Sequence, residues 1–334
     1  DTATVRGWLD SGSHNDFERL FVGEGWAGVG FDESAGGQGG GLLELALTAR
    51  ELGRAAVPSG SWLQSAIVAP ALATEAEVLT SAVSAGEVTA LAVRSDRIPQ
   101  AAPVQTFGRG LHGRIPCVLG AAQARQLLVP VRSGDSTSLW LVDRAAAGVE
   151  VLRRPLLDRS RDAADVILDD AVGRRLDVDA DGLIDEMASR AAVLVAADAL
   201  GACERMLDLT VEYSAQRQQF NVPIGSFQAV KHAAAQMLVT VESSTSITFY
   251  AAQSVEDHQP DRATHAAVAK AQVTGHATEL ADSALTLHGA VGYTWEHDLQ
   301  LFYKRANLNR VLFGTPTAWN ERIAASLPLI PAPA

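Results

Sequence analysis

Cysteine is scarce in this chain of 334 residues, and long apolar runs are missing. The two cysteines, Cys117 and Cys203, lie far apart without a CxxC pair. This excludes a disulfide scaffold and a cysteine-rich zinc site, and it favours a reducing, cytoplasmic setting. The eight histidines show neither HExxH nor HxxxH spacing, so no metal site is expected. No apolar run approaches the roughly 18–20 residues that span a bilayer, and residues 1–12 have no apolar leader, so neither a membrane segment nor a secretory signal is expected.

Basic residues are outnumbered in this chain. The 27 Lys and Arg residues face 39 Asp and Glu residues, for a formal net charge of −12. Nucleic acids and anionic membrane surfaces need a basic face for binding. The composition therefore excludes both as main partners, while a local arginine site for one phosphorylated ligand stays open.

The chain divides into three stretches of different character. Residues 1–85 have the pattern of helices interrupted by glycine-rich breaks, residues 86–178 that of short strands, and residues 179–334 that of long alanine-rich helices. We therefore expect an α+β fold with an N-terminal helical domain, a middle antiparallel β domain (a barrel or sandwich) and a C-terminal four-helix bundle. This order excludes the alternating strands and helices of a doubly wound sheet.

The periodicity also predicts individual elements. Helices are expected at 42–52, 65–79, 187–216, 229–253 and 262–288, with Gly53 as the stop signal of the first. Strands are expected at 88–93, 118–119, 126–131, 138–142, 148–152 and 164–168, with a hairpin between the third and the fourth. The glycine run at 36–41 follows a polar turn rather than a strand, so we interpret it as a structural loop and not as a dinucleotide-binding loop.

Two segments in the last third of the chain are rich in side chains that can bind a ligand. They are RQQFNVPIGSFQ at 217–228 and LHGAVGYTWEHD at 287–298. Arg217 is expected at the end of a long helix just before a turn, where its guanidinium can offer two parallel N–H donors to a pyrophosphate. The amides of Gln219 and Gln228 can add hydrogen bonds. The residues alone leave two interpretations open: a site for a phosphorylated ligand, or a surface arginine that caps the C-terminus of its helix.

Both segments resemble the C-terminal domain of the acyl-CoA dehydrogenases. Segments 25–28, 35–39 and 51–54 resemble that family's first domain, and the helical–β–helical order agrees as well. The resemblance implies FAD as cofactor and an acyl-CoA thioester as substrate. It also implies that the FAD of a neighbouring subunit is touched by Arg217, Gln219, Phe220 and Gln228, and that its adenosine diphosphate part lies beside Thr286, Leu287, His288, Gly289 and Ala290. Thr286 stands where the family usually has a glutamine, which weakens or alters that contact.

The family's reaction needs a carboxylate base for the α-proton of the acyl group. The family carries this base directly before a Gly-Thr pair near the C-terminus, where this chain has Phe313, or on the long helix, where the matching position is Ala191. Neither side chain can accept a proton, so no catalytic residue is expected here. The middle region also departs from the family's pattern. Of the family's flavin-facing strand motif this chain keeps only Ser95 and Asp96, and no Trp-Ile-Thr element is recognisable at 115–118.

One explanation accounts for both the missing catalytic base and the missing flavin-facing residues. We interpret the chain as a subunit of a heteromeric FAD-dependent acyl-CoA dehydrogenase, resembling the smaller subunit of the actinobacterial α2β2 enzymes of steroid degradation. A catalytic partner subunit would supply the Glu base and the flavin pocket, and the chain alone would be inactive. Two alternatives stay open: an enzyme that works alone with a displaced base at Glu204, Glu242 or Glu321, and a flavin-free structural or CoA-thioester-binding protein.

Overall fold

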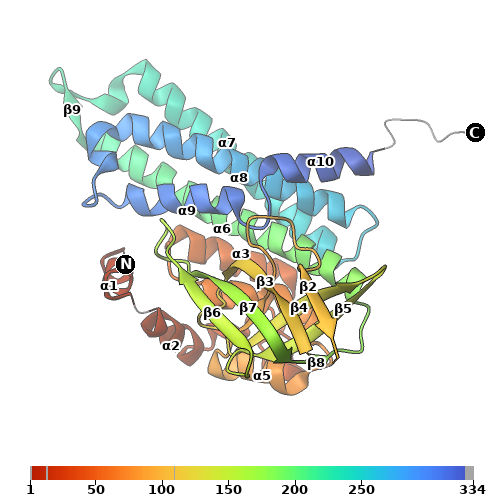
Figure 1. The fold of residues 1–334 in the computed structure, drawn as a ribbon. Coiled ribbons are helices and arrows are strands. Elements are labelled where there is room, and N and C mark those ends of the chain that lie inside the picture. The colour runs from red at the N-terminus through yellow and green to blue at the C-terminus, as the bar shows by residue number, and fades with distance from the viewer. Residues whose placement is uncertain (1, 13, 109, 328–334) are drawn as a thin grey trace, which may run out of the picture.

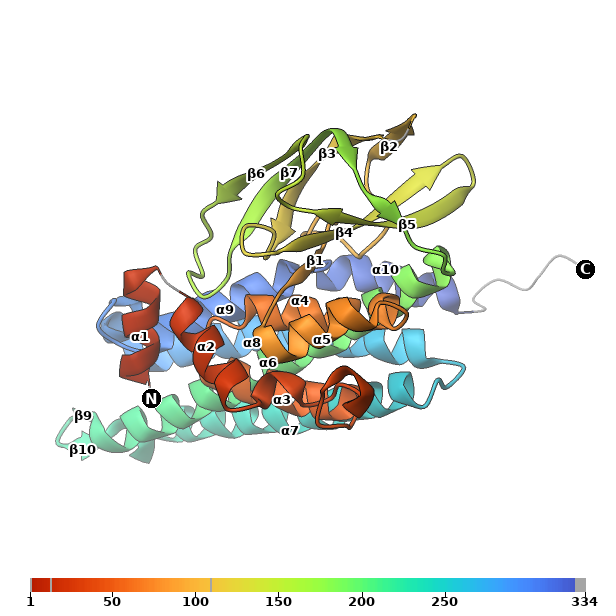
Figure 2. The ribbon, with the colours of Figure 1, turned by 90° about the horizontal axis from the view of Figure 1, so that it is seen from below.

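The computed structural model describes residues 2–12, 14–108 and 110–327. N-terminal helices come first, then a β part, then long helices that pack against the first set (Figure 1, Figure 2). This is the expected α+β order. Helix gives way to strand between Ala85 and Thr89, and strand to helix between Arg175 and Ala180. The division into domains 1–85, 86–178 and 179–334 stays a prediction.

The N-terminal helices agree only in part with the predicted ones. They are α1 (Thr2–Ser11), α2 (Asn15–Gly23), α3 (Leu42–Arg54), α4 (Gly60–Val68) and α5 (Ala76–Ala85), with short turns η1 (Trp26–Gly28), η2 (Glu33–Ala35) and η3 (Ala69–Leu72). α3 continues through Gly53, which is therefore not its stop. The prediction of a single helix at 65–79 is wrong. Pro70 has no N–H to donate, and the chain leaves the α-helix after Val68 and resumes it at Ala76.

The glycine run at 36–41 forms a loop that leads into α3. Its small residues have a steric reason, because a Cβ on Gly37 would lie 2.1 Å from the carbonyl oxygen of Phe31. At the end of the loop the Gly41 N–H donates to the Glu44 carboxylate at 2.7 Å, which caps the helix start. The run therefore has a structural task, as predicted.

Two sheets make up the described β part. One has the order β1-β4-β5-β8, from β1 (Thr89–Leu91), β4 (Gln126–Ser133), β5 (Ser136–Asp143) and β8 (Arg174–Arg175). The other has the order β2-β3-β7-β6, from β2 (Val104–Phe107), β3 (Gly110–Leu119), β7 (Ala163–Val172) and β6 (Val149–Arg154). β4 and β5 form the predicted hairpin. The expectation of a purely antiparallel part is wrong at one pair, because β1 runs parallel to β4 after the chain has crossed to the other sheet and returned.

The C-terminal bundle confirms the long predicted helices. It consists of α6 (Ala180–Gln216), α7 (Gln228–Glu256), α8 (Arg262–His288), α9 (Leu299–Val311) and α10 (Pro316–Ser326), with the turn η5 (Gly289–Tyr293) between α8 and α9. α6 is buried on nearly all sides because α3, α7 and α8 all pack on it. Small residues permit this approach: a Cβ on Gly201 would lie 1.8 Å from the Arg50 carbonyl oxygen. None of the described helices is both long and apolar enough to cross a membrane.

The path of the long helices brings distant segments together. α6 and α8 pack directly on each other and run the same way, and α7 runs in the opposite direction (Figure 1). The ends of α6 and α8 and the start of α7 therefore meet at one end of the bundle. Contact between side chains confirms this, because the Tyr213 ring on α6 stacks on the His288 ring at the end of α8 with centroids 4.5 Å apart.

Candidate functional site

A short hairpin projects from this end of the bundle, where the chain passes from α6 to α7 (Figure 1). Its strands are β9 (Gln218–Gln219) and β10 (Val222–Pro223). The turn residues Phe220 and Asn221 have φ angles of 53° and 62°, which suit a two-residue hairpin turn but strain a bulky side chain. Phe220 is 88% exposed, and its ring contacts only the edge of the described Phe227 ring, with centroids 6.2 Å apart. A strained, exposed ring at a hairpin tip suggests a contact outside this chain.

The polar side chains predicted to touch FAD have free donors. Arg217 follows α6 directly: its N–H donates to the Tyr213 carbonyl at 2.8 Å, and its own carbonyl accepts from Ile224 at 2.8 Å. Its guanidinium makes no hydrogen bond or ion pair with any described residue, and neither do the exposed side-chain amides of Gln219 and Gln228. The backbone is therefore held in place while the donors stay available.

The start of α7, next to Arg217, is also electropositive. Its first turn contains no acid, and the preceding Phe227 offers no side-chain cap. The free N–H groups at a helix start carry about half a positive charge and attract anions. Lys231 and His232 are exposed one turn further along. The hairpin base therefore suits a phosphate or pyrophosphate.

The second predicted stretch, at the end of α8, lies at the same end of the bundle. Thr286, Gly289 and Ala290 are exposed, and Leu287 is half-buried. The Thr286 hydroxyl already donates to the Asp282 carbonyl at 2.8 Å, so towards a ligand it can act only as an acceptor.

His288 differs from its neighbours because it is buried. Its ring is 3% exposed, with Nδ1 2.8 Å from the Ala284 carbonyl oxygen and one face on Tyr213. The side chain joins the ends of α6 and α8, so any ligand contact of His288 would have to come from its backbone.

Phe313, which the resemblance aligns with the catalytic base, is fully buried at 0% exposure. Its N–H donates to the Ser95 carbonyl at 2.6 Å, and its carbonyl accepts from Trp319 Nε1 at 3.0 Å. Ala191, the other candidate base position, is also 0% exposed inside α6. Both side chains belong to the core, and the Phe313 loop is fastened to the β part at Ser95.

The middle-region residues near Ser95 pair with one another. Arg94 and Asp96 form an ion pair at 2.6 Å. Asp165 on β7 is 1% exposed and accepts from Arg154 at 2.6 Å and Arg114 at 2.7 Å, which hold the pKa of its carboxyl well below the usual range. Paired charged groups thus lie beside 91–96 and 115–118, the segments where the resemblance looks for the flavin-facing strand and the Trp-Ile-Thr element.

The three candidates for a displaced base lie on three different helices. Glu204 on α6 is 7% exposed and accepts from Arg50 Nε at 2.9 Å, with Arg54 at 3.4 Å. Glu242 on α7 and Glu321 on α10 are exposed. The structure brings none of them to Phe313 or Ala191.

Sequence reasoning missed Lys270, which lies on α8 against the Phe313 loop. Its side chain is 0% exposed and donates to the carbonyls of Gly314 at 2.8 Å and Asn309 at 3.0 Å. No described carboxylate pairs with it, and burial lowers the pKa of Lys270 to about 7. A single lysine in an alanine-rich helix is normally predicted to be exposed, so the sequence gives no sign that Lys270 is buried.

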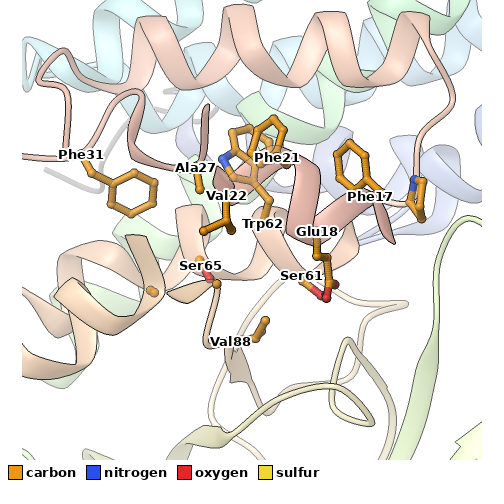
Figure 3. Close-up of a pocket in the computed structure, with 13 residues that line it drawn as sticks. Phe17, Glu18, Phe21, Val22, Ala27, Phe31, Ser61, Trp62, Ser65 and Val88 are labelled. Atoms are coloured by element: carbon orange, nitrogen blue, oxygen red, sulfur yellow. The ribbon is translucent and has the colours of Figure 1, made fainter. Parts of the chain in front are cut away.

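A small cavity lies away from these segments, among the N-terminal helices (Figure 3). Its volume of about 30 Å³ leaves room for one or two waters. Phe17, Phe21 and Trp62 line it, and burial raises the pKa of Glu18 at its edge. None of the predicted site residues borders this cavity.

The described fold combines N-terminal helices, two sheets and a long-helix bundle, and one end of the bundle presents side-chain donors without a described partner. The chain belongs to the acyl-CoA dehydrogenase family. Residues 183–327 match that family's C-terminal domain and residues 5–77 its N-terminal domain. It is therefore a member of a family of flavin-dependent oxidoreductases whose members typically bind FAD.

Two mycobacterial relatives are similar over most of this chain. The acyl-CoA dehydrogenase IpdE2 of Mycobacterium tuberculosis is 30% identical over 306 residues, 91% of this chain and 83% of the relative. The acyl-CoA dehydrogenase FadE34 of the same organism is 32% identical over 332 residues, 97% of this chain but only 44% of the relative. More than half of that longer protein therefore lies outside the match.

Solved structures confirm the fold. The ChsE4-ChsE5 complex of Mycobacterium tuberculosis is 27% identical with a TM-score of 0.81, covering 95% of this chain and 89% of the other. A variant of the Tcur3481-Tcur3483 steroid acyl-CoA dehydrogenase has a TM-score of 0.84 at 24% identity, covering 97% and 96%. Butyryl-CoA dehydrogenase of Megasphaera elsdenii has a TM-score of 0.84 at 19% identity, covering 93% and 89%.

Proposed function

We propose that this chain is the base-less subunit of a heteromeric, FAD-dependent acyl-CoA dehydrogenase that desaturates an acyl-CoA thioester between its α and β carbons. A partner subunit of the same family supplies the Glu base and the flavin pocket. This chain supplies contacts to the partner's FAD and a helical interface, in an α2β2 assembly. On its own it does not catalyse the reaction.

One contrast within the structure carries this proposal. Arg217, Gln219 and Gln228, which match contacts with a neighbour's FAD, are exposed and form no described side-chain hydrogen bond or ion pair. Phe220 at the hairpin tip is exposed, with its ring against Phe227. The positions matched to the base, Phe313 and Ala191, are fully buried and cannot take a proton. This contrast supports a chain that contacts a neighbour's cofactor but does not carry out the proton abstraction itself.

The residues at the hairpin fit a dinucleotide. Arg217 would pair with the pyrophosphate beside the electropositive start of α7, and the amides of Gln219 and Gln228 would add hydrogen bonds. Phe220 would pack on a flat ring, and the exposed part of 286–290 would lie beside the adenosine diphosphate. FAD supplies the two-electron acceptor of the reaction. This chain's part is to hold and orient the cofactor while the partner's carboxylate takes the α-proton.

Exposed apolar side chains occur both along α7 and on the hairpin. Leu238, Val239 and Tyr250 on α7 are exposed by 49%, 60% and 57%, and the hairpin carries the exposed Phe220 and Val222. Obligate interfaces bury about 2,000–5,000 Å² and are more apolar than transient ones. A partner subunit that covers this face would also cover the hairpin, so docking and cofactor contact would occur together.

Three relatives support a heteromeric assembly. ChsE4 and ChsE5 form a complex, and Tcur3481-Tcur3483 is a steroid acyl-CoA dehydrogenase of two proteins. FadE34 has, outside its match to this chain, room for a second unit of similar size. We therefore propose a second acyl-CoA dehydrogenase chain as partner and include steroid-derived CoA esters among the substrates.

Co-expression with the acyl-CoA dehydrogenase encoded next to this gene tests the proposal. We expect equal amounts of the two chains, two FAD per four chains, and acyl-CoA oxidation by the complex, whereas this chain alone is colourless and inactive. A single chain that is yellow and oxidises an acyl-CoA would refute the proposal. A stable complex without flavin absorbance would instead support the flavin-free alternative.

A further inference from the structure

A cleft near the hairpin end of the molecule is lined by cations that the proposed function does not use. It lies between α1, the loop before β7 and the start of α9, and has a volume of about 160 Å³. Arg6, Arg159 and Lys304 line it, one from each of these segments. Asp10 and Asp158 also line it, so three cations face two carboxylates and leave an excess of one positive charge among the lining residues, in a chain whose net charge is −12.

Lys304 is the cation of this cleft that has no described carboxylate within ion-pair distance. Arg6 is held by Asp298 at 2.7 Å, and Arg159 by Asp10 at 3.2 Å. The Lys304 ammonium instead donates to the side-chain amide oxygen of Gln300, one turn earlier on α9. Burial, Arg159 and Arg6 lower the pKa of Lys304, and Asp158 opposes them. A bound anion would relieve this crowding of positive charge.

Asp158 lines the cleft, but its carboxylate is already paired. It is buried, with 6% of the residue exposed, and it accepts from Arg305 Nε at 3.0 Å and from the Ser160 N–H at 3.0 Å. Its charge is therefore largely balanced by Arg305 and not by Lys304.

The rim of the cleft is apolar. Leu157 is 73% exposed, and Trp295 is 63% exposed with its ring centroid 3.5 Å from the Lys304 ammonium. An anion held at Lys304 would thus have an aliphatic and an aromatic surface beside it. A ligand with one negative charge and an apolar body satisfies both features.

We propose that this cleft binds a carboxylate carried on an apolar body, such as a medium-chain fatty acid anion. The carboxylate lies at Lys304 and Arg159, and the hydrocarbon covers Leu157 and Trp295. The site belongs to this chain alone and needs neither FAD nor a partner, so it can hold or fail independently of the proposed function.

Titration of the isolated chain with sodium octanoate tests the proposal by calorimetry and tryptophan fluorescence. We expect saturable binding with a Kd of about 1 mM. Lys304→Gln should raise this Kd at least tenfold, and Arg159→Gln should also raise it. Arg132→Gln, which removes an exposed arginine on β4, is the matched control and should leave the Kd unchanged. Trp295→Phe should abolish the fluorescence change while calorimetry still detects binding.

Probes that lack one of the two ligand features complete the test. Octanol, which lacks the charge, and inorganic phosphate, which lacks the apolar body, should each bind at least tenfold more weakly than octanoate. The proposal is wrong if octanoate does not saturate the isolated chain, if folded Lys304→Gln and Arg159→Gln variants bind it like the unmodified chain, or if either probe binds equally well.

Discussion

The binding free energy that Arg217 can contribute depends on whether its guanidinium is in water or covered by a partner subunit. In the single chain its guanidinium is exposed, and an ion pair formed there would be screened by water and salt. Beneath a partner subunit the same donors would be desolvated, and each charge-assisted bond to a pyrophosphate would contribute about 1.5–3 kcal/mol. Its effect is therefore to be sought in the complex.

Replacing Arg217 by Gln should weaken FAD binding by the co-expressed complex about tenfold or more, because charge-assisted bonds to the pyrophosphate are lost. The melting temperature of the single chain should not change, since the guanidinium has no described partner within it. Fluorescence titration of the deflavinated complex measures the Kd, with Arg132→Gln as control. An unchanged Kd in Arg217→Gln would show that this residue does not hold the cofactor.

Replacing Phe313 by Glu should not make the single chain active. The position is fully buried against the Ser95 backbone, so a carboxylate there would lose its hydration without reaching a substrate. We expect no dye-linked acyl-CoA oxidation and a loss of about 3 kcal/mol or more in the free energy of unfolding by urea. Phe313→Leu, which stays apolar, should lose less. Activity in the Glu variant would mean that only the base was missing.

Among the elements, the end of α9 depends on a neighbouring helix. The last carbonyls of a helix have no partner within it, and the Lys270 ammonium on α8 supplies donors to the Asn309 and Gly314 carbonyls there. The helix dipole favours a cation at this end. Burial without a carboxylate opposes it and lowers the pKa of Lys270 to about 7. The segment that holds Phe313 thus rests on a group that titrates near neutral pH.

Between pH 7 and 8.5, Lys270 should make the protein more stable as the pH rises. The unfolded lysine keeps its proton up to about pH 10.4, whereas the folded one loses it near 7, so the unfolded state binds more protons. Lys270→Met should remove this part of the pH dependence in urea unfolding. The window stops at 8.5 because burial raises the pKa of Cys203 to about 12, which acts in the opposite direction above that pH. Parallel stability curves for both proteins would disprove the effect.

At the scale of the whole molecule, a buried charge cluster joins all three parts of the chain. Asp198 on α6 accepts from Arg161 at 2.8 Å, from Arg305 at 2.8 Å and from Asn309 at 2.7 Å. Arg305 on α9 also donates to the carbonyl of Val57, which follows α3, at 2.7 Å. Its charges balance, with two arginines against Asp198 and Asp158. The cluster favours one relative placement of the N-terminal helices, the β part and the bundle.

Replacing Asp198 by Asn should lower the free energy of unfolding by about 3–5 kcal/mol, because two buried guanidinium groups would then share one carboxylate. The matched control is Asp185→Asn, which removes the same charge from the exposed pair with Arg322 at 3.0 Å and should cost about 0–1 kcal/mol. Urea unfolding of both variants measures the difference. Equal losses would mean that the cluster contributes no more than a surface pair.

Prediction from the sequence succeeded where the determinants are local. The helices at 187–216, 229–253 and 262–288 follow from unbroken helical periodicity, and the β4–β5 hairpin from two apolar runs around a polar tip. It failed at the parallel β1–β4 pair, because Thr89 and Gln126 are brought together by a crossover that neither segment encodes. It also failed at Lys270, whose burial is decided by α9 and the loop that follows it.

By itself, the sequence determined the order of helices and strands, the resemblance to acyl-CoA dehydrogenases, and the absence of a carboxylate at Phe313 and Ala191. These depend on residue identity and local periodicity. Only the tertiary structure decided that 217–228 and 286–290 share one end of the bundle, that Arg217 keeps its donors free, and that Phe313 is sealed against Ser95. Each of these is a matter of burial and contact between segments far apart in the chain, which arises when the helices and sheets pack.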